Sequence, residues 1–198
     1  MTKRSKHPKP PPAGTESRVE RSKKAVLGAT FQLLMNKGLS GLSIDEVSKR
    51  SGVAKTTIYR HWPSRTALLL DACSKLGSKF DTPDTGTLKG DVMAIVLGIV
   101  ARLRSRNFSS ILPSVIDAAE RDPQIAALHG RIHADTLSPL YAVLERAKSK
   151  GLLPHSCVTA DMVAALVGPL FYRRWFSRES IDDRFVRSIV SRALGATE

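Results

Sequence analysis

Cysteine is scarce in this sequence, and long apolar runs are missing from it. The two cysteines, Cys73 and Cys157, share no motif, which excludes a disulfide framework and suits a reducing cytoplasm. The longest apolar run, residues 93–101, is far shorter than the roughly 20 residues that a transmembrane helix needs. Because prolines rather than an apolar stretch follow the basic N-terminus, we expect no signal peptide, no membrane partner and a cytoplasmic location.

Catalytic signatures are also missing. The chain has no glycine-rich phosphate loop, no nucleophile elbow and no His-Glu-x-x-His pair, so we predict that it is not an enzyme and needs no cofactor. His129 and His133 have the spacing of metal ligands on one helix face, but the sequence places no third ligand beside them, and no metal is expected. Cys73 could react with oxidants, although no nearby cysteine is present to resolve the oxidised thiol.

Acidic residues are outnumbered, and the imbalance is concentrated in one part of the chain. Lys and Arg total 31 against 18 Asp and Glu, which gives a net charge of +13. Residues 1–79 hold 16 basic and 5 acidic side chains, whereas residues 80–198 hold 15 and 13. A basic part joined to a nearly neutral part indicates that the first meets a polyanion, and nucleic acid fits better than a membrane in the absence of an anchor.

The hydrophobic pattern divides the chain into three parts. Residues 1–17 are rich in lysine, proline and small polar residues, so we predict a disordered tail that either is passive or touches DNA as a basic arm. Residues 18–78 and 79–198 show helical periodicity, with a linker at 80–87, and no segment alternates as a strand would. We therefore predict an all-α fold, with an N-terminal three-helix DNA-binding domain and a C-terminal helical bundle for ligand binding and dimerisation.

Two short helices joined by a tight turn are expected in the N-terminal domain. Ser43 and Glu46 have the spacing of a capping box, which predicts a helix that ends before Gly52. A second short helix is expected over residues 54–61. Together with a leading helix over 18–36, this is the pattern of a helix-turn-helix, whose second helix enters the major groove of DNA.

The second of these helices carries side chains that suit DNA. Ile58 is expected to point inward, which leaves Tyr59, Arg60 and the threonine hydroxyls outside, where they can contact base edges or phosphate oxygens. Neighbouring basic side chains and helix N-termini add positive charge toward the phosphate backbone. The predicted contacts to double-stranded operator DNA are Ser43, Lys55, Thr56, Thr57, Tyr59, Arg60, His61 and Arg65.

Residues 41–69 resemble the DNA-binding domain of the tetracycline-repressor (TetR) family, and the resemblance extends over about 22–76. Its most specific mark is the aromatic-Pro-Ser-basic step Trp62-Pro63-Ser64-Arg65. Arg65 stands where the family usually has lysine, and Ser48 stands where it usually has alanine. The resemblance implies an all-helical, homodimeric regulator, usually a repressor, whose C-terminal domain binds a ligand and dimerises through its last two long helices.

The C-terminal part carries a less specific resemblance. Residues 115–124 and 168–176 are similar to one widespread TetR-like subgroup, which points to architecture rather than to a particular ligand. About five helices are expected, one of them over 109–121, and Pro139 and the pair Gly168-Pro169 should kink or split two others. The predicted function is a repressor that binds a palindromic operator and responds to a small apolar or amphipathic effector. A DNA-binding dimer without an effector is the alternative.

Apolar side chains of the bundle are candidates for a ligand pocket or a dimer interface, and burial within one subunit is the alternative for each of them. The pocket candidates are Val96, Val100, Ile111, Leu112, Val115, Tyr141 and Trp175. The dimer candidates lie in stretches that are too apolar for a solvated surface. They are Val163, Leu166, Val167, Leu170, Phe171, Phe185, Ile189 and Val190.

Overall fold

The computed structural model describes residues 17–74 and 81–195, and these residues form nine α-helices, one π-helical segment and no strand. The all-α fold predicted from the sequence is thereby confirmed, whereas nearly all of the predicted tail lies outside the described residues. The N-terminal helices are α1 (Arg18–Lys37), α2 (Ile44–Ser51), α3 (Lys55–His61) and α4 (Arg65–Cys73). The C-terminal elements are α5 (Leu88–Arg104), α6 (Arg106–Ala119), α7 (Pro123–Ser149), α8 (Thr159–Phe171), the π-helical η1 (Tyr172–Ser177) and α9 (Asp183–Gly195).

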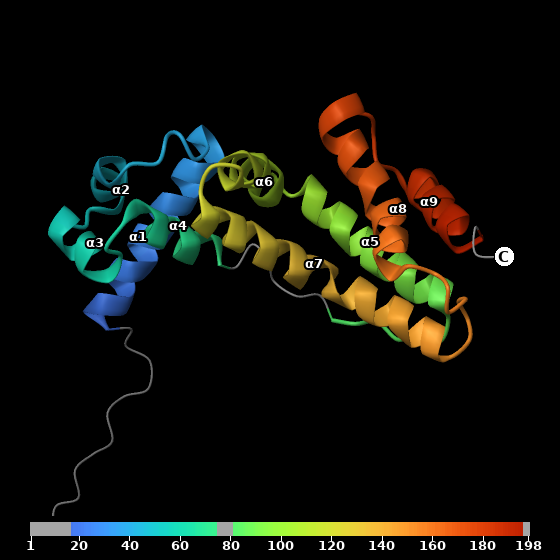
Figure 1. The fold of residues 1–198 in the computed structure, drawn as a ribbon. Coiled ribbons are helices and arrows are strands. Elements are labelled where there is room, and N and C mark those ends of the chain that lie inside the picture. The colour runs from blue at the N-terminus through green and yellow to red at the C-terminus, as the bar shows by residue number, and fades with distance from the viewer. Residues whose placement is uncertain (1–16, 75–80, 196–198) are drawn as a thin grey trace, which may run out of the picture.

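The helices are arranged along the length of α7, which is the longest of the described elements (Figure 1). Helices α1 to α4 gather at one end of the molecule, and α5 lies along α7 toward the other end. Helix α8 packs on α7 and α5, and α9 packs on α5 and α8. The N-terminal helices meet the bundle at two places, where α1 packs on α6 and α4 packs on α7.

Buried apolar side chains continue from the N-terminal helices into the bundle without a break. One cluster includes Leu33 of α1, Leu68 of α4, Val115 of α6 and Leu144 of α7, all of which are fully buried. The N-terminal helices and the bundle therefore share one close-packed core.

Most helices begin at the capping side chains that the sequence provides. Ser17, Ser43 and Ser64 each accept a hydrogen bond from the backbone N–H three residues later, at 3.1, 3.2 and 3.0 Å. The expectation that α6 begins at Ser109 is wrong, because Ser105 caps this helix and α6 begins at Arg106.

Three prolines lie in the interior of the described helices, Pro113, Pro139 and Pro169, and the last two have different effects. Pro139 does not split α7, which is continuous to Ser149. The proline removes the N–H that would bond to the carbonyl of Asp135, and the hydroxyl of Ser138 donates to this oxygen at 3.5 Å instead. Pro169 lies two residues before the end of α8 at Phe171, where the α-helix continues as the wider π-helical turns of η1.

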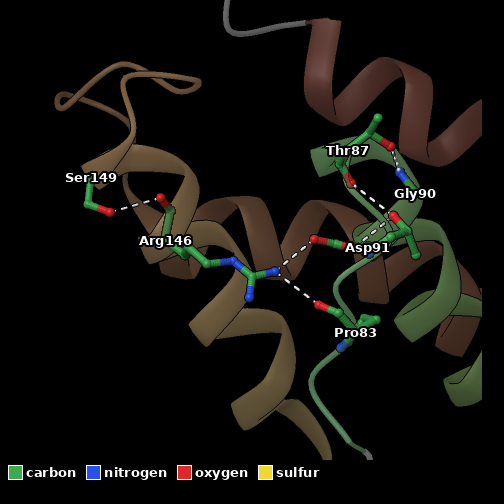
Figure 2. A network of polar contacts seen from close by, with 7 residues as sticks. Pro83, Thr87, Gly90, Asp91, Arg146 and Ser149 are labelled. Atoms are coloured by element: carbon green, nitrogen blue, oxygen red, sulfur yellow. Dashed lines mark hydrogen bonds and ion pairs between the residues drawn. The ribbon is translucent and has the colours of Figure 1, made fainter.

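A buried carboxylate holds the segment before α5 against α7 (Figure 2). Asp91 is 4% exposed and accepts hydrogen bonds from the backbone N–H of Thr85 at 2.6 Å and from its hydroxyl at 2.8 Å. Arg146 donates to the other carboxylate oxygen at 2.7 Å and to the carbonyl of Pro83 at 2.9 Å. The backbone bond from Thr85 is the main cause that lowers the pKa of Asp91. Burial opposes it, and the Thr85 hydroxyl and Arg146 assist it.

Replacing Asp91 with asparagine should lower the free energy of unfolding by about 1–3 kcal/mol at pH 7, because Arg146 loses the charge that it faces. The folded state lowers the pKa of this carboxyl, so its stabilisation is present above a pH of about 4 and is lost as the pH falls through the folded pKa. Urea denaturation of both proteins should therefore show curves of stability against pH that converge in acid.

The matched control is Asp81→Asn, an exposed carboxyl in the same segment, which should change the unfolding free energy by less than about 0.5 kcal/mol. A difference between Asp91→Asn and the unaltered protein that stayed constant from neutral to acid pH would contradict this account of the carboxylate.

Candidate nucleic-acid interface and effector cavity

The turn between α2 and α3 is fixed by three hydrogen bonds. Gly52 has a φ of 69°, a left-handed conformation that favours glycine, and its N–H bonds to the carbonyl of Ser48. The hydroxyl of Ser48 donates to the carbonyl of Val53 at 2.8 Å, and the hydroxyl of Ser51 accepts from the N–H of Val53 at 3.3 Å. Serine at position 48, where the resembling family usually has alanine, therefore adds a bond across the turn that a methyl group could not make.

Helix α3 is anchored by its inner face and by the residue that follows it. Ile58 is fully buried, and Trp62, one turn later, is 5% exposed. The indole N–H of Trp62 donates to the Asp71 carboxylate of α4 at 2.8 Å. These contacts fix the axis of a helix that spans only 7 residues.

The outer face of α3 is polar and positively charged. Thr56, Tyr59 and Arg60 are exposed, with 50% of the Tyr59 surface accessible, while Thr57 and His61 are half-buried. The ring of His61 meets the Trp62 ring edge-on, with 5.7 Å between centroids. The hydroxyls, the phenol and the guanidinium can thus donate hydrogen bonds to a partner that lies along this helix.

Three other predicted contacts already have partners within the chain. The hydroxyl oxygen of Ser43 accepts the capping bond of α2, and Lys55 forms an ion pair with Asp45. Arg65 donates to the carbonyl of Leu39, which ties the start of α4 to the loop after α1. Lys55 and Arg65 are both exposed, so their charges also face solvent beside α3.

A cavity of about 420 Å³ lies between α5, α6, α7 and α8. Its apolar lining includes Phe108 and Leu112 of α6, Leu137 and Tyr141 of α7, and Phe171 of α8. The polar lining consists of Arg102, His129, His133 and Thr136. A concave site of this size with a mainly apolar wall and a few polar groups is typical of small-molecule sites.

The structure brings only part of the predicted pocket set to this cavity. Leu112 and Tyr141 line it, whereas Trp175 lies in a separate hollow beside η1. The remaining pocket candidates are buried in the core and do not line the cavity; they are Val96, Val100, Ile111 and Val115.

The sequence interpretation considered His129 and His133 only as metal ligands and missed Arg102 and Thr136, although one signal was present for Arg102. Arg102 falls in the same helical stripe as the buried Ile95 and Ile99 of α5, where an arginine interrupts an apolar face. An arginine in such a stripe needs a polar environment, which indicates a polar binding site within the bundle.

The predicted dimer residues are mainly buried within the subunit. Leu166, Leu170 and Val190 have no exposed surface, and Ile189 has 3%. Val163, Val167 and Phe171 line the cavity, and Phe185 is half-buried, with the Arg173 guanidinium 3.4 Å from its ring centroid.

The geometry of the described residues supports neither a metal site at His129 and His133 nor an oxidant-sensing role for Cys73. His129 and His133 have ring centroids 6.5 Å apart, and no group of three or more potential metal ligands occurs within 17–74 and 81–195. Burial raises the pKa of Cys73 to about 12, so this thiol stays protonated and unreactive. Within the same residues, no helix is long and apolar enough to cross a bilayer.

Comparisons with known proteins agree on one family. Residues 26–72 match the model of "Bacterial regulatory proteins, tetR family", and residues 82–193 match "Tetracyclin repressor-like, C-terminal domain". The HTH-type transcriptional regulator YdeS of Bacillus subtilis is 28% identical over 178 residues, which cover 89% of each chain. The DNA-binding transcriptional repressor TetR of Mycobacteroides abscessus is 28% identical over 181 residues, or 90% of this chain and 94% of that protein.

Solved structures agree with these relatives. The TetR family transcription regulator SCO0332 is 29% identical and superposes with a TM-score of 0.63, covering 89% of this chain and 98% of that one. The flavonoid-responsive regulator FrrA, at 20% identity, has a TM-score of 0.74 over 89% of this chain and 95% of its own, which shows a shared fold.

The helix-turn-helix and the helical bundle attached to it in the same polypeptide define a transcriptional regulator that binds DNA. The second family match alone spans more than half of the sequence, and the chain belongs to the TetR family. The resemblance inferred from residues 41–69 is thereby confirmed.

Replacing Trp62 with phenylalanine removes the indole N–H and its bond to Asp71. We expect the free energy of unfolding to fall by about 1–3 kcal/mol, since a buried bond to a carboxylate and some packing are lost together. Thermal or urea unfolding followed by circular dichroism measures this change. Tyr59→Phe is the matched control, because it alters a half-exposed aromatic ring on α3, one turn before Trp62, and should have almost no effect. Equal stabilities of the two variants would show that the indole bond does not anchor α3.

Proposed function

We propose that this regulator is a repressor that binds a palindromic operator as a homodimer and leaves it when a small effector occupies the cavity between α5 and α8. One observation carries the proposal: α6 and α7, which line the cavity, pack directly on α1 and α4 through a continuous core. The proposal involves no catalytic step, and it has the protein act in the cytoplasm, on DNA.

The DNA contacts would come from the outer face of α3. Thr56 and Arg60 would meet base edges, and Tyr59 and His61 would donate to phosphate oxygens. The exposed charges of Lys55 and Arg65 would lie against the backbone on either side. In a dimer, two such helices about 34 Å apart fit successive turns of the major groove.

The dimer contact is supported by the outer face of α8 and η1. Ala165 is exposed there, and such a small side chain lets a partner helix approach closely. Tyr172 and Phe176 follow on the same face, 59% and 78% exposed, with their rings stacked at 12° and 6.0 Å between centroids. Exposed stacked aromatic rings are costly in water and are the side chains that most often anchor protein interfaces.

The route from the effector to DNA would pass through the contact of α1 with α6. Gly38, which ends α1, has a φ of 65°, and a β-carbon added to it would lie 2.9 Å from the hydroxyl oxygen of Ser114. An effector that shifts α6 would therefore push on the end of α1 and change the spacing of the two α3 helices. Couplings of this kind typically amount to about 1–3 kcal/mol in DNA affinity.

Thr56→Ala and Tyr59→Ala should each weaken operator binding about 5- to 50-fold without changing the unfolding temperature, because both side chains are exposed on α3. Fluorescence anisotropy with a labelled fragment of the adjacent promoter region measures the affinity. Gln32→Ala, an exposed polar residue on α1, is the control and should bind as the unaltered protein does. Unchanged affinity in both α3 variants would overturn the proposed docking.

Phe176→Asp should convert the dimer to a monomer at micromolar concentration, because it removes an aromatic anchor and adds a charge. The dimer dissociation constant should rise at least about tenfold. Sedimentation velocity measures the change. Leu152→Asp is the control, since Leu152 is also apolar and is 60% exposed, but it lies beyond the end of α7. A Phe176→Asp protein that sediments as the dimer would place the interface elsewhere.

A further inference from the structure

A hollow of about 540 Å³ lies beside η1, between the end of α5 and the segment that leads into α9. It shares no lining residue with the cavity between α5 and α8, so a ligand bound here would be additional to the proposed effector. Four arginines contribute to its wall, and they are Arg104 of α5, Arg173 and Arg174 of η1, and Arg178. Guanidinium groups gathered around one hollow create a positive potential that attracts an anion.

Three of these arginines are oriented by backbone carbonyls. Each donates to a main-chain oxygen, and the pairs are Arg104 with Ile181, Arg173 with Ser180 and Arg174 with Leu103. Arg174 uses its Nε for this bond, at 3.1 Å, and its two terminal nitrogens have no hydrogen-bond partner within residues 17–74 and 81–195. A guanidinium fixed in this way presents paired N–H donors in a rigid fork, which suits an oxyanion.

The acidic residues of the lining do not neutralise these charges. Glu179 forms an ion pair with Arg173 at 3.1 Å, and Asp182 accepts a hydrogen bond from the N–H of Phe185 at 2.8 Å. No carboxylate of the described residues forms an ion pair with the other three arginines of the lining. Because four arginines face two acids, the hollow keeps a surplus of two positive charges.

Arg178 has an unfavourable backbone conformation and no contact that compensates for it. Its φ is 56°, and it is the only non-glycine residue with a positive φ in the part of the chain that the structure describes. Its side chain is exposed and forms no hydrogen bond or ion pair with a described residue. Glycine adopts this conformation more readily, so the fold by itself gives no reason for an arginine here. Residues held in such conformations cluster at functional sites, which agrees with a role in ligand binding.

We propose that the hollow binds an organic phosphate monoester, with its phosphate group on Arg174 and Arg178 and its apolar body against Trp175. A phosphate monoester carries about 1.5–2 negative charges at pH 7, which matches the surplus charge of the lining better than the single charge of a carboxylate does. Its terminal oxygens accept several N–H bonds from two guanidinium groups at once.

The volume and the aromatic wall favour an organic ester over the bare ion. Ligand pockets typically enclose about 300–1,000 Å³, and this hollow, at about 540 Å³, is much larger than an inorganic phosphate needs. Trp175 is half-buried, and its ring centroid lies 5.2 Å from that of Phe171, so the indole is held in place by packing. An aromatic group of the ligand can stack on this ring.

Calorimetric titration of the full-length protein without DNA tests the site, in about 0.15 M NaCl to screen weak contacts with exposed charges. The probes are 1-naphthyl phosphate and adenosine 5′-monophosphate. They are compared with 1-naphthol and adenosine, which lack the phosphate, and with inorganic phosphate, which lacks the organic part. At least one ester should bind about tenfold or more tightly than both its neutral parent and inorganic phosphate.

Arg178→Gly separates a binding role from a structural role. It should weaken ester binding at least about fivefold and should leave the unfolding temperature unchanged or raised, because glycine adopts a φ of 56° without strain. Arg178→Lys should retain part of the affinity, since lysine keeps the charge but loses the fork. A lower unfolding temperature of Arg178→Gly would show that the arginine serves the fold and would overturn its assignment to the site.

Arg187→Gln is the matched control, because Arg187 is exposed on α9 and is not part of the lining. It should bind the esters as the unaltered protein does. Ester affinity that is unchanged in Arg178→Gly, an equal loss in Arg187→Gln, or no ester binding at millimolar concentration would each overturn the inference. Inorganic phosphate that binds as tightly as both esters would overturn the organic class of the ligand.

Discussion

The burial of Ile58 and Trp62 is the constraint on which the outer face of α3, the proposed DNA contact, depends. A helix of 7 residues is too short to be stable by itself in water, so α3 exists because its inner side chains leave water for the core. The bond of Trp62 to Asp71 and the turn fixed by Ser48 then set its direction. The outer face can consequently consist of hydroxyls and cations that contribute nothing to packing.

The N-terminal helices were predictable because local chemistry determines them. Ser43, Ser64 and Gly52 act within one turn of their own positions, so capping and turn rules locate the helix ends to within a residue or two. The inward direction of Ile58 is likewise predictable, because it is the apolar residue among the polar side chains of α3. The role of Trp62 was not predictable in the same way, because its partner Asp71 lies nine residues away and meets it only after folding.

The bundle was predictable in outline but not in detail. An apolar stripe on α8 indicates burial, but it does not say whether the cover is another helix, a ligand or a second subunit. Leu166 and Leu170 are covered by their own chain, whereas Val163 and Val167 border a cavity. Pro139 does not split α7, and the Ser138 hydroxyl donates to the carbonyl of Asp135 that the proline leaves without its helical N–H partner. Such outcomes depend on contacts between elements, which periodicity does not encode.

The close approach of Gly38 to Ser114 has a consequence for how this regulator can diversify. A side chain at this position would have to adopt the left-handed φ of 65° and place its β-carbon 2.9 Å from the Ser114 hydroxyl oxygen, so the contact between α1 and α6 favours glycine. Exposed side chains on α3 and lining side chains of the cavity face no such restriction. Under the proposed function, substitutions on α3 and in the cavity can change the operator and the effector without altering the contact between Gly38 and Ser114.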